Sequence, residues 1–195
     1  IEAAGLAPAA EILRLAGDRD LAYALGVHAP SLEGFLFPDT YLFERPTAAR
    51  RILATMVKRH QRIYRPAWHA RASRMRRSHL QVVTLASLIE REATGPGDIG
   101  PVATVLHNRL RYDWKLEAEA SAAHAERLAT GAFDGQVDEA DRLREHPYNT
   151  YLHKGLPPGP LCSPGQAALK AALWPPLEDA IYYATAADGR RIYCP

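Results

Sequence analysis

The sequence predicts an α+β fold: a helix-rich core with a small, mostly antiparallel sheet that includes a C-terminal β-hairpin. Helical periodicity dominates the middle of the chain, while strand-like segments cluster near its ends, which is unlike the regular alternation of a doubly wound fold. The 195 residues, 47% hydrophobic and 24% charged, describe a globular chain that needs neither a disulfide framework nor a metal to fold. Its apolar runs fall far short of the roughly 18 residues of a membrane span.

The N-terminal part predicts helices separated by an extended segment. Residues 8–26 fit two short helices divided by a Gly-Asp pair. Residues 31–43 are rich in aromatics and are interrupted by glycine and proline, which predicts extended segments around a turn. Residues 47–65 have helical spacing, with Thr47 as the expected cap.

A basic stretch covers residues 45–89, which contain 11 Lys and Arg and neither Asp nor Glu. Tyr64 and Trp68 lie within it, so basic and aromatic side chains could together follow a nucleic-acid backbone. The alternative is the solvated face of a helix that two aromatic anchors attach to the core. Because no nucleic-acid-binding motif accompanies the charges, we expect the second arrangement and no nucleic-acid partner.

The C-terminal half predicts two further helices and the hairpin. Residues 99–110 place their apolar side chains on one face. Ser163 followed by a proline marks the expected start of a helix that continues over 166–173. The tail 180–194 predicts two strands that turn at Asp188-Gly189.

The clearest helix, residues 81–93, carries two carboxylates. At helical spacing, Glu90 and Glu92 fall on opposite flanks of an apolar stripe, each about 80° from its centre, while Thr84 and Arg91 point to solvent. Small side chains precede Glu90 by one turn and leave room for a ligand. A carboxyl half-buried against an apolar wall has a raised pKa and can donate a proton near neutral pH. The alternative is that both acids pair with nearby arginines.

Five segments match the motifs of one family in order: LEGFLFPDTY (32–41), LASLIEREA (85–93), VLHNRL (105–110), YNTYLHKGLPPGPLCSPGQAALKAALWP (148–175) and YYATAADGR (182–190). On these motifs the chain resembles the YceG-like (MltG) family, the endolytic lytic transglycosylases of bacterial peptidoglycan. The matches span most of the chain, and five motifs in family order are far more specific than any one of them.

The resemblance implies a reaction that needs one acid. The bond between N-acetylmuramic acid and N-acetylglucosamine would break without water and leave a 1,6-anhydromuramoyl end. The first Glu of the family's helix motif corresponds to Glu90, which would act as general acid and then as base. A glycoside hydrolase needs two carboxyls roughly 5–9.5 Å apart, whereas here the sugar's own 6-hydroxyl is the attacking group. The reaction therefore requires no metal and no cofactor.

The other motif residues are expected to position the glycan. Their amides, hydroxyls and charges can bond sugar hydroxyls and N-acetyl groups, and the GLPPG loop can form a stiff groove wall. The expected substrate-binding residues are Ser87, Asn108, Arg109, Glu117, Glu119, Asn149, Thr150, Tyr151, Gly155, Leu156, Pro157 and Pro158.

One segment, residues 116–124, departs from the family pattern. Glu117 and Glu119 stand where the family usually has Gln and Asp. Two alternatives follow: a hydrolase that uses Glu90 with Glu117 or Glu119 as the base, or a glycan-binding or division-scaffold module with impaired catalysis.

The resemblance also implies organisation and location. We expect residues 1–44 to be the remnant of, and linker from, a preceding LysM-like subdomain, and 45–195 to be the catalytic domain. Because the chain opens on Ile1 rather than Met, we expect a piece of a longer protein. That protein would be anchored by a single N-terminal helix in the bacterial inner (cytoplasmic) membrane, with its catalytic part extracytoplasmic, or periplasmic. Its partners would be peptidoglycan strands and the cell-wall synthesis and division machinery. Whether Cys162 and Cys194 pair is left open.

Overall fold

A computed structural model describes residues 1–186 and 191–195, and within them it confirms the α+β prediction. The elements, in chain order, are α1 (Ala9–Ala16), α2 (Arg19–Ala24), α3 (Ala49–Ile63), α4 (Pro66–Arg74), α5 (His79–Glu92), α6 (Ile99–Arg111), α7 (Glu119–Thr130), α8 (Glu139–Arg142), α9 (Gln166–Leu173), β1 (Tyr182–Thr185) and β2 (Arg191–Cys194). The two strands form an antiparallel pair in which Tyr183 lies opposite Tyr193.

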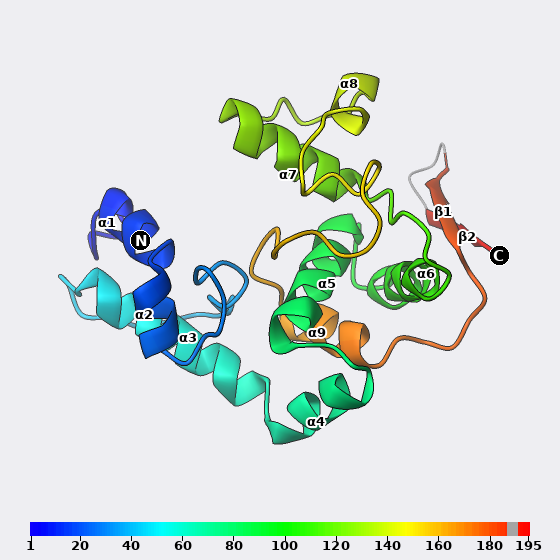
Figure 1. The fold of residues 1–195 in the computed structure, drawn as a ribbon. Coiled ribbons are helices and arrows are strands. Elements are labelled where there is room, and N and C mark those ends of the chain that lie inside the picture. The colour runs from blue at the N-terminus through cyan, green and yellow to red at the C-terminus, as the bar shows by residue number, and fades with distance from the viewer. Residues whose placement is uncertain (187–190) are drawn as a thin grey trace.

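Helix α5 is the centre of the molecule. It packs along α9 and also contacts α4, α6 and α7, while the hairpin lies beside α6 (Figure 1). Residues 82–89 are buried on every side. The expected solvent face at Thr84 is therefore wrong: this side chain is only 2% exposed. A helix enclosed by neighbours needs no polar face, and its apolar surroundings are what make it the core of the fold.

Ser78 sets the start of α5 through a capping box. Its hydroxyl accepts a hydrogen bond from the Gln81 backbone N–H at 3.1 Å, and the Gln81 side chain accepts one from the Ser78 N–H at 2.8 Å. The pair satisfies two backbone donors that the first turn of a helix leaves unpaired. Because the helix starts at a defined residue and is held on all sides, the directions of its last two carboxylates are also defined.

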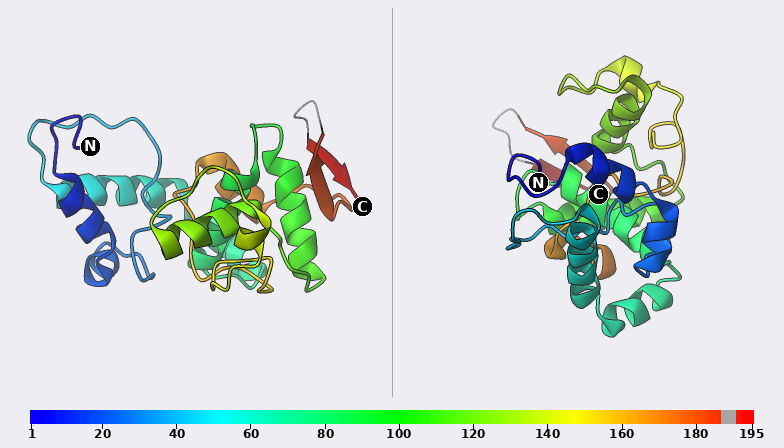
Figure 2. Two further views of the ribbon diagram at one scale, coloured as in Figure 1. Left: turned by 90° about the horizontal axis from the view of Figure 1, so that it is seen from above. Right: turned by 90° about the vertical axis from the view of Figure 1, so that its left-hand side faces the viewer.

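The N-terminal segment and the hairpin lie at opposite ends of the molecule (Figure 2). Helix α1 packs against α3 and α2, at the end away from β1 and β2. Leu15, Leu32 and Phe35 belong to the same buried apolar cluster as Leu53 and Leu85. Residues before and after position 44 thus share one core. The expected boundary between a subdomain remnant at 1–44 and a catalytic domain at 45–195 stays a prediction.

Several helix ends differ from the sequence expectations. The N-cap of α3 is Ala48 and not the expected Thr47. The Thr47 hydroxyl instead donates a hydrogen bond to the backbone carbonyl of Glu44. Helix α9 starts after Gly165, so Ser163 is not its cap. The predicted hairpin turn at Asp188-Gly189 lies outside the described residues, whereas both of its strands are confirmed.

Helices α4, α7 and α8 were not expected. The N-terminus of α4 has Pro66 at a position where the missing N–H costs nothing. Helix α7 is alanine-rich, and its N-cap, Ala118, carries no capping side chain, so the sequence gives no start signal. No described helix has the length and apolar character needed to cross a membrane.

The basic stretch forms α3 and α4, with its aromatic anchors turned inward. Tyr64 is 2% exposed and Trp68 is 5% exposed. Their rings pack edge-to-face with centroids 5.7 Å apart. Because these rings are in the core, they are not available to stack on bases, and the charged side chains cover the outside of the two helices.

Buried imidazoles join α3 to α5. The Nε2 atoms of His60 and His79 lie 3.0 Å apart. The His79 ring stacks on Tyr64, with centroids 4.0 Å apart, and both imidazoles contact Phe35. Burial lowers the pKa of His60 to about 4, and burial with the neighbouring His60 lowers the pKa of His79 to about 3. Both rings are therefore neutral in the folded chain at neutral pH.

This cluster predicts an acid-sensitive fold. In the unfolded chain these histidines titrate near 6.5, so between about pH 6.5 and 4 the unfolded state binds more protons. Stability is complete above that range and is lost as the pH falls, with His60 alone contributing a loss of about 1–2 kcal/mol between pH 7 and pH 5. Chemical denaturation across this range should show a smaller pH slope for His79→Gln, which keeps a polar nitrogen without the titration. His28→Gln, at an exposed ring, is the control, and an equal slope in all three proteins would contradict the assignment.

Candidate active site

A cavity of about 170 Å³ opens where the C-terminal end of α5 meets the start of α7 and the hairpin. It joins parts of the chain that are far apart in sequence. Its lining residues are Glu92, Glu117, Glu119, Tyr151, Tyr183, Ala184 and Arg191.

Glu92 lies at the base of this cavity and is 4% exposed. Its Oε1 accepts a hydrogen bond from the Ala120 backbone N–H at 2.7 Å, and its Oε2 accepts one from the Tyr183 hydroxyl at 2.7 Å. A guanidinium nitrogen of Arg191 lies 3.9 Å from Oε2 and donates to the backbone carbonyl of Glu92 at 2.8 Å. Burial is the largest influence and raises the pKa of Glu92, against these hydrogen bonds and the arginine, which favour the charged form.

The contact with Ala120 also explains how α7 begins. Ala118 at the N-cap has no side chain that can accept a hydrogen bond. The carboxylate of Glu92 takes this place from another helix, and a negative group at a helix N-terminus is favoured by the helix dipole. The same contact therefore fixes the start of α7 and holds one oxygen of Glu92, while the Tyr183 hydroxyl holds the other.

Glu117 and Glu119 line the cavity but are already paired. Glu117 has a left-handed backbone, with φ of 48°, and its Oε2 lies 2.9 Å from Nη1 of Arg109. Oε1 of Glu119 lies 2.7 Å from Nη2 of Arg142. Both carboxylates are about half exposed. Their charges are balanced by arginines, unlike that of Glu92, whose arginine is at the edge of ion-pair distance.

Tyr151 and Tyr183 supply the hydroxyl groups of the cavity. Burial, and after it the charge of Glu119, raises the pKa of Tyr151. Burial and the neighbouring carboxylate of Glu92 raise the pKa of Tyr183. Both phenols stay protonated, so Tyr183 acts as a hydrogen-bond donor to Glu92.

Arg109 holds the cavity wall from inside. It is 7% exposed. Its Nε donates to the Ile181 carbonyl at 2.8 Å, and its Nη1 donates to the carbonyls of Lys115 and Leu116 at 3.2 and 3.0 Å. It therefore ties the entry of the hairpin to the segment before α7. These bonds give Arg109 a positioning role within the fold, and the glycan contact expected from the sequence stays a prediction.

Three further residues expected to bind substrate are buried, and their polar atoms are used within the chain. The Asn149 amide donates to the carbonyls of Asp141, Arg142 and Arg144 at 3.0, 3.1 and 2.9 Å. The other two are Thr150 and Ser87.

Thr150 anchors the start of α7, and Ser87 anchors the loop that follows GLPPG. The Thr150 hydroxyl accepts from the Ala118 N–H at 3.0 Å and shares a hydrogen bond with the Ser121 hydroxyl at 2.7 Å. The Ser87 hydroxyl accepts from the Leu161 N–H at 2.9 Å. Ser87 is 0% exposed and Thr150 is 1% exposed, so neither is open to a ligand.

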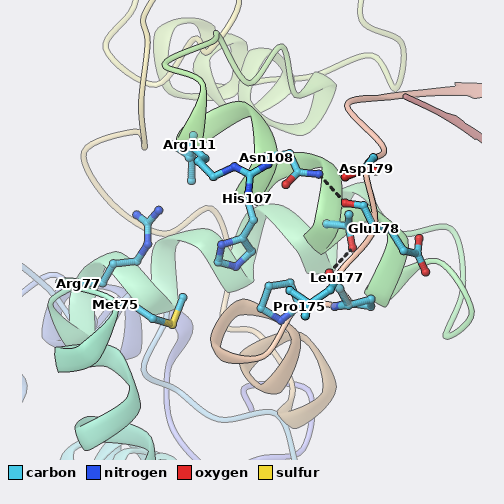
Figure 3. Close-up of a pocket in the computed structure, with 12 residues that line it drawn as sticks. Met75, Arg77, His107, Asn108, Arg111, Pro175, Leu177, Glu178 and Asp179 are labelled. Atoms are coloured by element: carbon cyan, nitrogen blue, oxygen red, sulfur yellow. Dashed lines mark hydrogen bonds between the residues drawn. The ribbon is translucent and has the colours of Figure 1, made fainter.

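Asn108 faces a different cavity, of about 420 Å³, which lies between α6 and residues 175–179 (Figure 3). Its amide donates to the carbonyls of Glu178 and Ala180, each at 2.9 Å. His107 lines the same cavity, and burial lowers its pKa to about 4. Asn108 thus secures the chain leading to β1 and does not share the cavity of Glu92.

Glu90 lies outside the Glu92 cavity. Its side chain is exposed and lines a cavity of about 230 Å³ with Thr94 and Pro96. Both carboxylate oxygens lie 3.8 Å from the position that a Cβ would take on Gly165, the N-cap of α9. The expected half-burial of Glu90 is therefore wrong. The opposite flanks of the helix were predicted correctly, but α7 covers the flank of Glu92 and leaves that of Glu90 open.

The GLPPG loop is part of the framework. Gly155 has a left-handed backbone, with φ of 84°, which glycine adopts without strain. Leu156 packs against the core, Pro157 is buried and Pro158 is exposed. Lys154, just before the loop, forms an isolated antiparallel β-bridge with Lys115 through the backbone. This pairing places the segment beside the cavity wall that carries Glu117.

The sequence indicates both carboxylates of α5 and assigns the catalytic role to Glu90, but it does not single out Tyr183 or Arg191. Helical periodicity places Glu90 and Glu92 on equivalent flanks, and the long-range packing of α7 and the hairpin against α5 distinguishes their surroundings. Among the described residues, no group of three or more His, Cys, Asp or Glu is placed to hold a metal. Cys162 and Cys194 are both free thiols.

Comparison with known proteins gives consistent matches. A sequence profile of the YceG-like family matches residues 3–194. The chain is 33% identical over 163 residues to an endolytic murein transglycosylase of Bacillus subtilis (strain 168), covering 83% of this chain and 44% of that protein. It is 27% identical to one from Streptococcus pneumoniae serotype 2 (strain D39 / NCTC 7466), covering 83% of this chain and 29% of that protein.

A solved structure is also similar. The crystal structure of a putative yceG-like protein from Listeria monocytogenes superposes with a TM-score of 0.84 at 27% identity, covering 96% of this chain and 65% of that one. The chain thus spans less than half the length of the curated relatives it matches.

The buried amides predict an order of stability losses. Asn149→Ala leaves three carbonyls without their donor inside the fold and should lower the free energy of unfolding by about 3 kcal/mol. Asn108→Ala removes two hydrogen bonds at a half-buried site and should cost about 1 kcal/mol. Chemical denaturation measures both. Equal losses, or a larger loss for Asn108→Ala, would mean that Asn149 does not have the anchoring role described here.

Proposed function

The chain belongs to the YceG-like family, and we propose that it is the catalytic part of an endolytic murein transglycosylase. The substrate is the glycan strand of peptidoglycan, and the bond cleaved joins N-acetylmuramic acid to N-acetylglucosamine. The names of the curated relatives support the reaction class. The observation that carries the residue assignment is the burial of one carboxyl, Glu92, at the base of the cavity.

We propose Glu92 rather than Glu90 as the general acid. A proton donor near neutral pH needs a raised pKa, and burial raises that of Glu92. Glu90 is exposed to water in a cavity that the other candidate residues do not line. Glu90 and Glu92 lie two positions apart in the same family motif. Assigning the acid role to Glu92 instead of Glu90 therefore leaves the proposed reaction unchanged and changes only the residue that performs it.

The reaction balances with this single carboxyl. Protonated Glu92 gives its proton to the glycosidic oxygen as the bond from that oxygen to C1 of the muramoyl sugar breaks. The 6-hydroxyl of the same sugar attacks C1 and closes the 1,6-anhydro ring. The carboxylate of Glu92 then takes the proton of that hydroxyl and returns to its starting form. The attacking group is part of the substrate, so no second reactant has to be recruited.

The neighbours of Glu92 suit both protonation states. The Ala120 N–H and the Tyr183 hydroxyl donate to the carboxylate formed after the first proton transfer. Arg191 adds a positive charge 3.9 Å from Oε2. Burial opposes that charged form, so the group is an acid at the start and a competent base one step later.

A hydrolase remains the second candidate because Glu117 and Glu119 line the same cavity. Either could serve as the base that activates water for Glu92. Their ion pairs with Arg109 and Arg142 weaken this alternative, since a paired carboxylate is a poorer base. Mass spectrometry separates the two, because hydrolysis gives reducing ends that are heavier than anhydro ends by one water.

A module that binds glycan without cleaving it is the third candidate. It is motivated by the changed segment 116–124, and it predicts capture of peptidoglycan without release of muropeptides. We further propose that the whole protein is anchored in the bacterial cytoplasmic membrane with this part outside it, and that it works beside the cell-wall synthesis and division machinery. Fractionation of cells and affinity capture of the full-length protein test these points.

Replacing the two carboxyls separately tests the assignment. Glu92→Gln keeps an oxygen acceptor for the Ala120 N–H and places an amide NH2 against the Tyr183 hydroxyl oxygen, which can accept from it. The substitution removes the acidic proton, so release of anhydro-ended products from isolated sacculi should fall by about 10²–10⁴-fold. Glu90→Gln is the matched control on the same helix and should keep most of the activity. Circular dichroism and thermal melts establish that both variants fold. Loss of activity in Glu90→Gln with an active Glu92→Gln would reverse the assignment.

The pH profile gives an independent test through Tyr183. Its hydroxyl stabilises the charged form of Glu92, so Tyr183→Phe should raise the pKa of that carboxyl further. Because the acid form starts the reaction, the alkaline limb of kcat/KM should move to higher pH. Tyr193→Phe is the control, since that hydroxyl donates to Asp98 at 3.0 Å. An unchanged alkaline limb in Tyr183→Phe would mean that Glu92 is not the group that titrates in the reaction.

A further inference from the structure

Three aromatic side chains form an exposed row beside the Glu92 cavity. Tyr112, Trp114 and Tyr182 are 51%, 41% and 47% exposed. The ring centroids of Tyr112 and Trp114 are 6.3 Å apart, and those of Trp114 and Tyr182 are 6.1 Å apart. Large apolar groups that gather on a surface, rather than occurring singly, mark interaction sites. We refer to these three residues as the aromatic row.

The aromatic row is held in place from below. The guanidinium carbon of Arg109 lies 5.1 Å from the centroid of the Tyr182 ring. The backbone N–H of Trp114 donates a hydrogen bond to the Arg109 carbonyl at 2.9 Å. Asp113, which lies between Tyr112 and Trp114 in the sequence, adopts a left-handed backbone conformation with φ of 53°. The Asp113 carboxylate lies 2.7 Å from Nζ of Lys154. The turn is thereby fixed with its aromatic side chains outward.

Arg109 also connects the aromatic row to the cavity. Nη1 of Arg109 lies 2.9 Å from Glu117, which lines the cavity, while the guanidinium lies over Tyr182 in the row. On strand β1, Tyr182 is the neighbour of Tyr183, the donor to Glu92. The hairpin and the end of α6 lie side by side in Figures 1 and 2. Tyr182 and Tyr183 project from opposite faces of β1, Tyr182 toward the row and Tyr183 toward Glu92. The strand and Arg109 thus hold the two surfaces at a fixed relative position.

We propose that the aromatic row is an accessory subsite for the glycan strand, which stacks the faces of sugar rings several residues away from the bond that is cleaved. The inference rests on the proposed function and deepens it, because it names how this chain holds a long strand. Aromatic rings have electron-rich faces. The C–H groups on one face of a pyranose ring are slightly positive, so a sugar packs face-on against such a ring while its hydroxyls stay in water.

The chemistry of the row fits a glycan better than a protein surface. The rings are bordered by cationic groups, since Arg111 lies 4.8 Å from the Tyr112 centroid and donates to its hydroxyl at 2.7 Å. Lys115 is exposed next to Trp114, whereas the charge of Lys154 is paired with the Asp113 carboxylate. Muramic acid carries a lactyl carboxylate, or a peptide stem with free carboxylates, beside its ring. Aromatic faces with flanking cations therefore match an alternating strand of neutral and acidic sugars.

Binding of strands of defined length tests the subsite. Peptide-free glycan strands are separated by length and titrated against Glu92→Gln protein, which does not cut them. Adding Trp114→Ala should weaken affinity for long strands about tenfold, the usual effect of truncating an aromatic anchor, and leave the affinity for a disaccharide unchanged. Trp114→Phe should keep most of the affinity. In the protein with an intact Glu92, the Trp114→Ala variant should show a raised KM on long strands with unchanged kcat.

Trp174→Ala is the matched control, because Trp174 is also 41% exposed but packs against Trp68, away from the aromatic row. It should bind strands of every length as the parent does. Tyr182→Ala is the second variant if Trp114→Ala does not fold. The proposal is overturned if both row variants bind long strands normally, if Trp174→Ala weakens binding equally, or if the row variants change only self-association in sedimentation. If the unaltered protein cleaves sacculi in any of these cases, the proposed function stands and only the subsite fails.

Discussion

The contact on which the rest of the structure depends is the one between the Glu92 carboxylate and the start of α7. Ala118 offers α7 no cap, and Glu92 supplies it from the end of α5. Its second oxygen accepts from Tyr183, so the same carboxyl also fixes β1. Central helix, lateral helix and hairpin meet at this one group. The cavity between them exists because all three are held there, and the carboxyl is buried for the same reason.

This arrangement joins stability to chemistry. A buried carboxylate costs free energy unless hydrogen bonds and charges compensate for lost water. Glu92 receives two short hydrogen bonds and a distant arginine, which hold it in position without removing the effect of burial on its pKa. A close ion pair like that of Glu119 would hold the Glu92 carboxylate more firmly, but it would lower the pKa of Glu92 and favour its ionised form. The incomplete compensation at Glu92 leaves a carboxyl with a raised pKa in a well-ordered site.

The sequence predicts the fold class, most helices, the hairpin strands and the two flanks of α5, because these follow from local spacing. It does not predict which flank is buried, since α7 covers one of them and α7 has no local start signal. The polar motif residues show the same limit. The motifs single out Asn149, Thr150 and Arg109 for glycan binding, and in the structure their polar groups form hydrogen bonds with the backbone inside the fold. A motif records that a polar group is required, and the required partner is visible only in three dimensions.

Arg109 shows why framework and binding surface are difficult to separate in this chain. A buried guanidinium needs several acceptors, and Arg109 finds them in the carbonyls of Lys115, Leu116 and Ile181. Those acceptors lie on two segments that are far apart in sequence, the one before α7 and the one that leads into β1. Its remaining interactions are with Glu117 on the cavity side and Tyr182 on the side of the aromatic row. A rigid support for the acid is thus, through the same side chain, a rigid support for the aromatic rings. On the proposed function, a glycan strand that reached both surfaces would meet a fixed arrangement of the aromatic rings and the Glu92 carboxyl.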